Sequence, residues 1–302
     1  MSDTGGADGS PAGKWMRAIG RVLLFLGLFA LLLLAGSLLV PPGEELTTRN
    51  LVAQSVLVLG AAVVAGIVML VRFEERPAGA LGFGVTRAAP VESVQGLAIG
   101  LAAIAVPVAC LALAGTVRFA AQPGTAGAWL AAIGRDFALL AVAAAAEEAL
   151  FRGYAFQVLV RGFGAVPAVL ATSVAFSVAH GGNPNVDAIG LLNIFLAGIV
   201  LAIAYLRTRS LWFATAVHLG WNWGMASVLD LPVSGLEMID TPLYEPVVSG
   251  AEWLSGGRFG PEGGIAGTAG FAIALLAILT WRAVRERDET RALRPLIHTR
   301  EA

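Results

Sequence analysis

Two adjacent acids interrupt an apolar stretch of the chain. Glu147 and Glu148 follow the run Ala-Val-Ala-Ala-Ala-Ala, and Arg152 comes four residues after Glu148. A charge in a bilayer core costs roughly 2.5–3.5 kcal/mol on insertion scales, so an acid there needs a partner or a function. The i,i+4 spacing predicts that Glu148 pairs with Arg152 on one helix face. Glu147 points about 100° away from that pair, which leaves it as the candidate general base.

The three histidines limit where histidine chemistry can occur. His180 follows Phe176 by four residues and His218 precedes Asn222 by four, so the members of each pair share a helix face. His298 lies in the charged C-terminal segment and is taken as solvated. Each polar residue has a structural interpretation when taken alone, as an ion pair or as a hydrogen bond between helices. Because the acid pair, both non-terminal histidines and Asn222 all fall in the apolar segments near 134–156, 164–181 and 210–229, we interpret the set as a hydrolytic site.

The composition indicates that most of the chain does not face water. Of the 302 residues 57% are hydrophobic and 14% charged, whereas soluble proteins average about 25% charged residues. Eight segments have the roughly 20 apolar residues that a spanning helix needs, and they run near 20–40, 51–71, 94–115, 134–156, 164–181, 187–206, 210–229 and 263–282. The expected fold is therefore an all-α, polytopic membrane helix bundle with about eight transmembrane helices. The net charge of -1 implies no nucleic-acid partner, and the single cysteine, Cys110, excludes a disulfide framework.

Lysine and arginine gather in alternate loops of this eight-helix plan, which predicts the orientation of the chain. Both termini are expected in the cytoplasm and the protein in the plasma (inner) membrane, with the acidic 230–262 loop on the other side. We expect a disordered cytoplasmic tail over 1–13, a transmembrane domain over 14–285 and a charged cytoplasmic tail over 286–302.

Distances along the helices test whether the candidate residues can meet. At about 1.5 Å per residue, Glu147 and His180 each lie about 22–24 Å from an expected helix turn at 162–164. His218 lies only roughly 13 Å from the cytoplasmic end of its own helix. The depths predict that Glu147 and His180 face each other, and that His218 is offset by about 10 Å.

Three motifs carry a resemblance to a known family: Glu147-Glu148-x-x-x-Arg152, Phe176-x-x-x-His180 and His218-x-x-x-Asn222. They resemble the motifs of the CAAX protease and bacteriocin-processing family of intramembrane endopeptidases, also called the abortive-infection or type II CAAX prenyl endopeptidase family, and bacterial members in particular. The resemblance covers about residues 130–226, which would form the catalytic core.

The resemblance implies hydrolysis of a peptide bond inside the membrane. Glu147 would activate water with assistance from His180, and His218 and Asn222 would stabilise the oxyanion. Glu148, Arg152 and Phe176 would support these groups. The substrate would be a membrane-embedded or membrane-associated peptide or protein in the lipid bilayer, and the composition argues against a prenylated one.

A zinc-dependent mechanism is the alternative to a metal-free one. Glu147, His180 and His218 could together bind zinc with one position open. However, the chain has no His-Glu-x-x-His motif, the usual zinc signature on one helix. We therefore favour no cofactor, with zinc kept as the alternative.

Two other classes of function fit the same residues. A non-catalytic membrane immunity or scaffold protein could share the fold, because fold and motif do not guarantee turnover. A proton-coupled transporter could use Glu147 and Glu148 as its proton site. We find no inverted repeat, which disfavours the transporter.

Overall fold

A computed structural model describes residues 11–39, 48–237 and 239–298. Most of the tail expected over 1–13 lies outside these residues, and residues 11–13 already belong to the first helix rather than to a tail. Residues 299–302 of the expected C-terminal tail, and the side chain of His298, also lie outside the described part.

The described chain is a bundle of helices, which confirms the predicted fold class. The longer helices are α1 (Pro11–Leu39), α2 (Thr48–Phe73), α3 (Ala89–Leu113), α4 (Ala126–Phe151), α5 (Tyr154–Phe163), α6 (Ala165–Ala179), α7 (Ala188–Thr208), α8 (Leu211–Trp223) and α10 (Ile265–Thr280). Short elements are η1 (Ala78–Leu81), η2 (Gly224–Val228), α9 (Glu252–Ser255), η3 (Gly257–Phe259), η4 (Pro261–Gly263), α11 (Asp288–Ala292) and η5 (Leu296–His298).

Each of the eight predicted segments falls on a helix, but the number that crosses the bilayer stays a prediction. Within the described residues, five stretches are long and apolar enough to span it by length and composition, namely α1, α2, α3, α7 and the stretch Ala126–Phe163. The apolar helices α6 and α10 are shorter. These helices make the protein a multi-pass membrane protein by composition.

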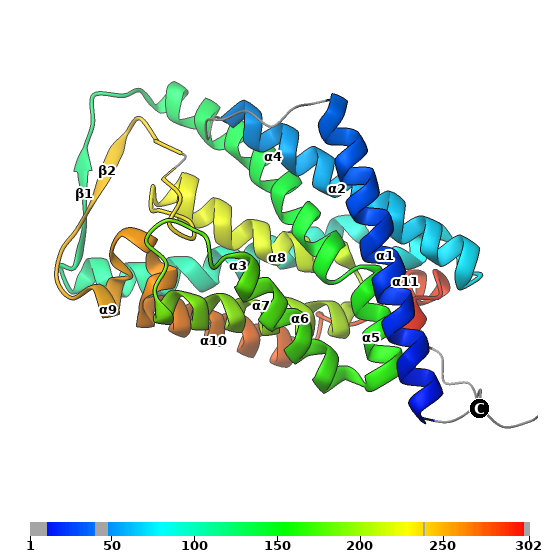
Figure 1. Cartoon of the computed structure of the whole chain (residues 1–302). Helices are drawn as coiled ribbons and strands as arrows, with labels where there is room; N and C mark the ends of the chain where they lie inside the picture. Colours follow the sequence, from blue (N-terminus) through cyan, green and yellow to red (C-terminus); the bar gives the residue numbers. More distant parts are fainter. Residues whose placement is uncertain (1–10, 40–47, 238, 299–302) are drawn as a thin grey trace, which may run out of the picture.

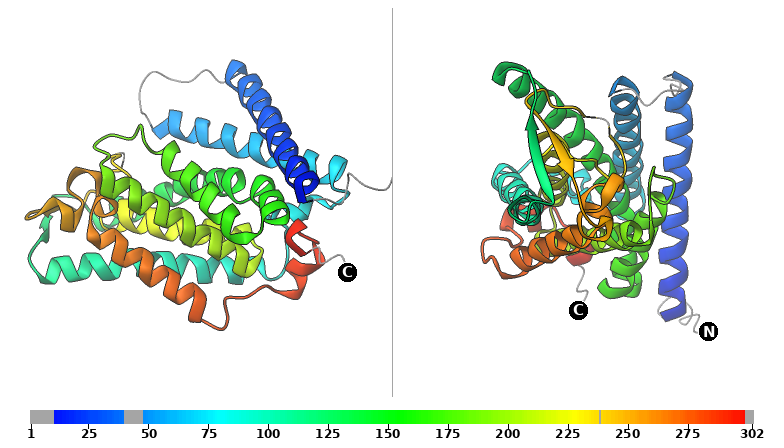
Figure 2. Two further views of the ribbon diagram at one scale, coloured as in Figure 1. Left: turned by 60° about the horizontal axis from the view of Figure 1, so that its bottom comes forward. Right: turned by 90° about the vertical axis from the view of Figure 1, so that its left-hand side faces the viewer.

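The helices are arranged around the pair α3 and α8, as Figures 1 and 2 show. Helices α2 and α4 pack together on one side of this pair, α7 and α10 lie on the other, and α1 runs along the outside against α2 and α5. Gly100 of α3 and Gly220 of α8 allow the central pair to approach closely. A Cβ on Gly100 would overlap the backbone oxygen of Val217, and a Cβ on Gly220 that of Leu97. Small residues permit such backbone contact between membrane helices.

The predicted helix over 134–156 is wrong at both ends. Helix α4 begins at Ala126, where Thr125 caps it by accepting a hydrogen bond from Ala128 N, and it ends at Phe151. The chain breaks at Arg152 and Gly153 and resumes as α5. A Cβ at Gly153 would overlap the backbone oxygen of Ala149, so glycine permits this tight break. The expected turn at 162–164 then joins α5 to α6.

A small two-stranded sheet was not predicted. Strand β1 (Val117–Ala121) pairs antiparallel with β2 (Tyr244–Val248), with Phe119 opposite Pro246. The ribbon joins the segment before α4 to the long loop after α8 at one end of the bundle (Figure 1). At the opposite end, residues 284–296 fold back onto the helices, with Leu296 buried and its N–H donated to Gln157 Oε1.

Candidate active site

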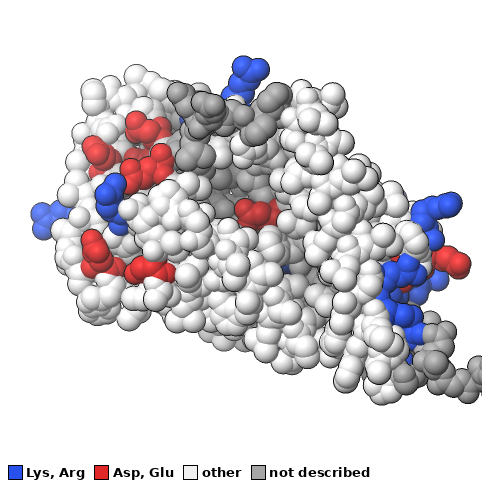
Figure 3. Space-filling view, viewed as in Figure 1, with Lys and Arg blue, Asp and Glu red and all other residues white. Residues whose placement is uncertain are grey.

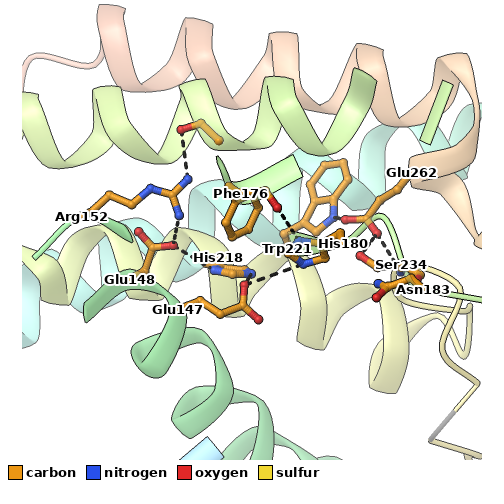
Figure 4. A network of polar contacts seen from close by, with 11 residues as sticks. Glu147, Glu148, Arg152, Phe176, His180, Asn183, His218, Trp221, Ser234 and Glu262 are labelled. Carbon is orange, nitrogen blue, oxygen red and sulfur yellow. Dashed lines mark hydrogen bonds and ion pairs between the residues drawn. The ribbon is translucent and has the colours of Figure 1, made fainter. Parts of the chain in front are cut away.

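Glu147 lies between the two intramembrane histidines. Its Oε2 is 3.9 Å from Nε2 of His180 and 3.9 Å from Nε2 of His218. Figure 4 shows Glu147 reaching from α4 toward these rings, which come from the end of α6 and from α8. The Glu147 side chain is 34% exposed, yet its Oε2 is buried and has no hydrogen-bond partner among the described residues. The carboxylate and two imidazole nitrogens therefore border one small space.

Glu148 occupies a different environment one residue away. It is fully buried and accepts a 3.0 Å hydrogen bond from Arg152 Nη1. Arg152 is also fully buried, donates from Nη2 to the backbone oxygen of Gly198 at 3.1 Å, and lies 4.5 Å from the ring centroid of Phe176. The predicted i,i+4 ion pair is therefore present, and Arg152 ties α4 to α7 through Gly198.

Each histidine is oriented by an acceptor on its Nδ1. His180 Nδ1 lies 2.8 Å from the backbone oxygen of Phe176, and His218 Nδ1 lies 3.1 Å from Glu148 Oε1. A carbonyl or carboxylate oxygen only accepts, so each Nδ1 carries the hydrogen. When either ring is neutral, its Nε2 therefore presents a lone pair toward Glu147.

The predicted 10 Å offset of His218 is wrong. That estimate measured the depth of Glu147 along one straight helix to residue 162, whereas the chain breaks at Arg152 and Gly153. Glu147 therefore lies only about four residues, or roughly 6 Å, from the end of α4 at Phe151. His218 lies seven residues into α8, roughly 10 Å from its start, so the two side chains meet.

The site opens into a cavity of about 870 Å3. Glu147, Phe176, His180, His218 and Asn222 all line it, so the structure brings every proposed catalytic residue to one space. Asn222 lies one helical turn beyond His218 on α8. In the space-filling view an acidic surface is visible at the bottom of a hollow in the bundle's side (Figure 3).

A second polar network borders the same cavity and was missed by the sequence reasoning. Glu262 is buried and accepts hydrogen bonds from Trp221 Nε1 at 2.9 Å, Ser234 N at 2.8 Å and Ser234 Oγ at 2.7 Å. Asn183 Nδ2, three residues after His180, donates to Ser234 O at 2.9 Å. The network, drawn in Figure 4, fastens the loop that follows His180 to the helix that carries His218. Glu262 gave no signal in the sequence because it lies in a Gly-rich loop where acids are usually solvated.

An acid at the cavity rim has a perturbed protonation equilibrium. Asp230 follows η2 and lines the cavity. Burial raises the pKa of Asp230, and the hydrogen bond that Thr241 N donates to its Oδ1 at 3.0 Å opposes this rise only in part. Asp240 and Glu245 raise the pKa further through charge repulsion. Asp230 therefore keeps its proton to a higher pH than an ordinary aspartate, because its pKa is raised.

The zinc alternative was tested against the spacing of its three ligands. Zinc bonds nitrogen and oxygen at about 2.0–2.2 Å, so two atoms 3.9 Å apart would subtend roughly 145° at the metal. A tetrahedral site requires about 109°. Within the described residues no group of three or more His, Cys, Asp or Glu side chains is arranged to hold a metal ion. The donor types of Glu147, His180 and His218 suit zinc, but their spacing does not fit it.

Comparison with known families agrees with the motifs. The sequence model of a family described as type II CAAX prenyl endopeptidase Rce1-like matches residues 127–224. This range includes all seven residues of the three motifs, so the match agrees with the resemblance that the motifs carry. At the level of the family, the match supports a CAAX-type intramembrane protease. No curated protein matches the chain.

Proposed function

We propose that this protein is an intramembrane endopeptidase in which Glu147 activates water to hydrolyse a peptide bond of a membrane-associated peptide. The observation that carries the proposal is the position of Glu147 Oε2, 3.9 Å from Nε2 of both His180 and His218 at the cavity wall. Direct hydrogen bonds are shorter than this, at about 2.7–3.2 Å. One water lying off the line between two of these atoms would bridge them at hydrogen-bond distance from each.

The geometry suits a bridging water between Glu147 and His180. With hydrogen bonds of about 2.8 Å to each atom, a water spanning 3.9 Å would make an angle of roughly 90°, close to its own bond angle. Both acceptors are available, because His180 holds its hydrogen on Nδ1. The water would donate one hydrogen to each group and direct a lone pair into the cavity. General-base catalysis of this kind contributes typically 10²–10⁴-fold.

His218 and Asn222 are the proposed donors to the developing oxyanion. His218 donates its Nδ1 hydrogen to Glu148, so its Nε2 carries a hydrogen only when the ring is a cation. Arg152 and His218 as cations, with Glu147 and Glu148 as anions, make a cluster of zero net charge, which suits a buried site. The Asn222 amide supplies a second, neutral donor to the cavity.

The proposed reaction needs no external oxidant or cofactor. Water oxygen bonds to the scissile carbonyl carbon as Glu147 takes the proton, and the carbonyl oxygen becomes an oxyanion held by His218 and Asn222. Glu147 then passes the proton to the leaving nitrogen as the C–N bond breaks, which leaves a new carboxylic acid and a new amine, and the acid releases its remaining proton to solvent. Zinc held by Glu147, His180 and His218 is the alternative drawn from the sequence, but the spacing of these residues does not fit it.

The test is a peptidase assay of the purified protein in lipid nanodiscs with internally quenched apolar peptides. Glu147→Gln is expected to lower the cleavage rate by at least about 10²-fold, whereas Glu289→Gln, an exposed acid at the far end of the bundle, is expected to leave it unchanged. Cleavage by wild type should persist in 1,10-phenanthroline. Loss in the chelator with recovery on adding zinc would favour the metal mechanism, and equal rates for wild type and Glu147→Gln would reject Glu147 as the base.

A further inference from the structure

The charges of the chain are divided between the two ends of the bundle. One end holds fourteen lysines and arginines, at the start of α1, the end of α2, the start of α3, the α5–α6 turn, the end of α7 and the segment after α10: Lys14, Arg17, Arg21, Arg72, Arg76, Arg87, Arg161, Arg207, Arg209, Arg282, Arg285, Arg287, Arg291 and Arg294. Figure 3 shows basic side chains gathered at this end. Of the other described basic residues, Arg152 is inside the site, and four lie elsewhere: Arg49, Arg118, Arg135 and Arg258.

The cavity lies toward the opposite end. Its walls come from the beginning of α2, the loop after α6, the loop after α8 and strand β2, and each of these lies at the end of the bundle away from the basic cluster. Among its described lining residues, the acids are Glu147, Asp230, Glu237, Asp240, Glu245, Glu252 and Glu262, and the basic residue is Arg258. Fully buried Tyr205 and Leu211 belong to the packed core toward the basic end of the bundle and do not line the cavity.

Membrane proteins keep the lysines and arginines of their short loops in the cytoplasm. From this rule and the position of the cavity, we infer that the active-site cavity opens on the non-cytoplasmic side of the membrane, and that its substrates are extracytoplasmic segments of membrane-associated peptides. That these segments are substrates rests on the proposed function, whereas the side of the membrane on which the cavity opens does not depend on it.

This placement separates the protein from the prenylated substrates that appear in the description of the family whose model matches residues 127–224. Prenyl anchors act together with basic segments that are attracted to the anionic cytoplasmic leaflet. A cavity reached from the other side, with an acidic wall, does not meet such a C-terminus. A peptide that has been exported, or that presents its chain at the outer surface, would reach Glu147 through the loops after α6 and α8.

Thiol accessibility of the full-length protein in its membrane tests the inference. In a Cys110→Ala background, single cysteines replace Asp240 at the cavity rim, Ala143 on the cavity wall and Val85, which is exposed at the basic end. A small, membrane-impermeant thiosulfonate is applied to spheroplasts and to inverted vesicles. The D240C and A143C proteins are expected to react in spheroplasts, and V85C only in inverted vesicles.

Other outcomes overturn the inference. If V85C reacts in spheroplasts and D240C only in inverted vesicles, the orientation is reversed. If A143C reacts only in inverted vesicles or in neither preparation, the cavity is not reached from outside. The labelling needs no proteolysis, so its result is distinct from that of the peptidase assay. The same quenched peptides should then be cleaved in wild-type spheroplasts and remain intact with Glu147→Gln.

Discussion

Replacing each of the two adjacent acids by glutamine separates stability from chemistry. Glu148 is fully buried against the fully buried Arg152, whereas Glu147 is 34% exposed and its Oε2 has no hydrogen-bond partner in the described structure. Removing one partner of a buried ion pair costs about 3–5 kcal/mol, because the remaining charge is left uncompensated. Glutamine can still accept one hydrogen bond from Arg152, so we expect Glu148→Gln to destabilise by about 3 kcal/mol.

The same change at Glu147 is expected to have little effect on the free energy of unfolding. We expect Glu147→Gln to lie within about 1 kcal/mol of wild type, since it removes no ion pair of hydrogen-bond length. Thermal unfolding of the purified variants in one detergent measures the difference. The melting temperature of Glu148→Gln should be roughly 10 °C below that of wild type. The Glu147→Gln protein should have the same melting temperature as wild type but cleave no peptide.

A double-mutant cycle distinguishes the ion pair from a general loss of packing. The Glu148→Leu and Arg152→Met double variant replaces both charges by apolar groups. We therefore expect it to lose less free energy of unfolding than the sum of the losses in the two single variants. The coupling should exceed about 1 kcal/mol. Equal destabilisation by Glu147→Gln and Glu148→Gln, or additive effects in the cycle, would refute the division of roles between the two acids.

Three further predictions concern residues around the site. Glu262→Ala removes three hydrogen bonds to Trp221 and Ser234 and is expected to lower stability by about 2–4 kcal/mol, measured by thermal unfolding; an unchanged melting temperature would show that the network does not hold the loop. The Gly100→Ala variant should be less stable than wild type by about 1–3 kcal/mol in the same measurement, because its Cβ would overlap Val217 O. The Gly60→Ala variant, which has open space around its Cβ position, should be neutral or stabilising. Equal effects of the two changes would contradict the close α3–α8 contact. Burial raises the pKa of Asp230 in the folded protein, so the stability that its protonated form contributes is present at low pH and is lost as pH rises through that pKa. The Asp230→Asn variant should therefore be as stable as wild type near pH 4 and more stable than wild type near pH 7. A variant that is less stable than wild type at pH 7 would contradict this sign.

Apolar length and motif spacing predict most of the bundle because both are local properties. The expected helices near 51–71 and 187–206 agree with α2 and α7 within about three residues, since long apolar runs define them. The break at Gly153 was not predicted, because a single glycine inside a helical pattern is usually tolerated. Helix α4 also begins at Ala126 rather than near 134, and it continues through Arg135 and Asp136, where buried Asp136 accepts a hydrogen bond from Arg135.

The candidate site was predictable where its residues share one helix and unpredictable where they do not. The spacing of Glu148 and Arg152 gives their ion pair directly. The spacing of Phe176 and His180 places the backbone oxygen of Phe176 next to Nδ1 of His180. The bond between His218 and Glu148 joins helices that are 70 residues apart in sequence, and nothing local indicates it. The hydrogen bonds of Glu262 are harder still to predict from the sequence, because its partners lie in α8 and in a loop without regular structure.

Adjacency of the two acids has a physical consequence that neither acid would have alone. Successive helix residues point about 100° apart, so one turn of α4 directs Glu148 into the packed interior and Glu147 into the cavity. His218 contacts both, through Nδ1 to Glu148 and through Nε2 toward Glu147. Any change that moves α4 along its axis therefore shifts Glu147, the proposed base, and Glu148, the partner of His218, together, and their relative geometry is preserved. Arg152 limits that movement, because it binds Glu148 and the backbone of α7 from the C-cap position that directly follows α4.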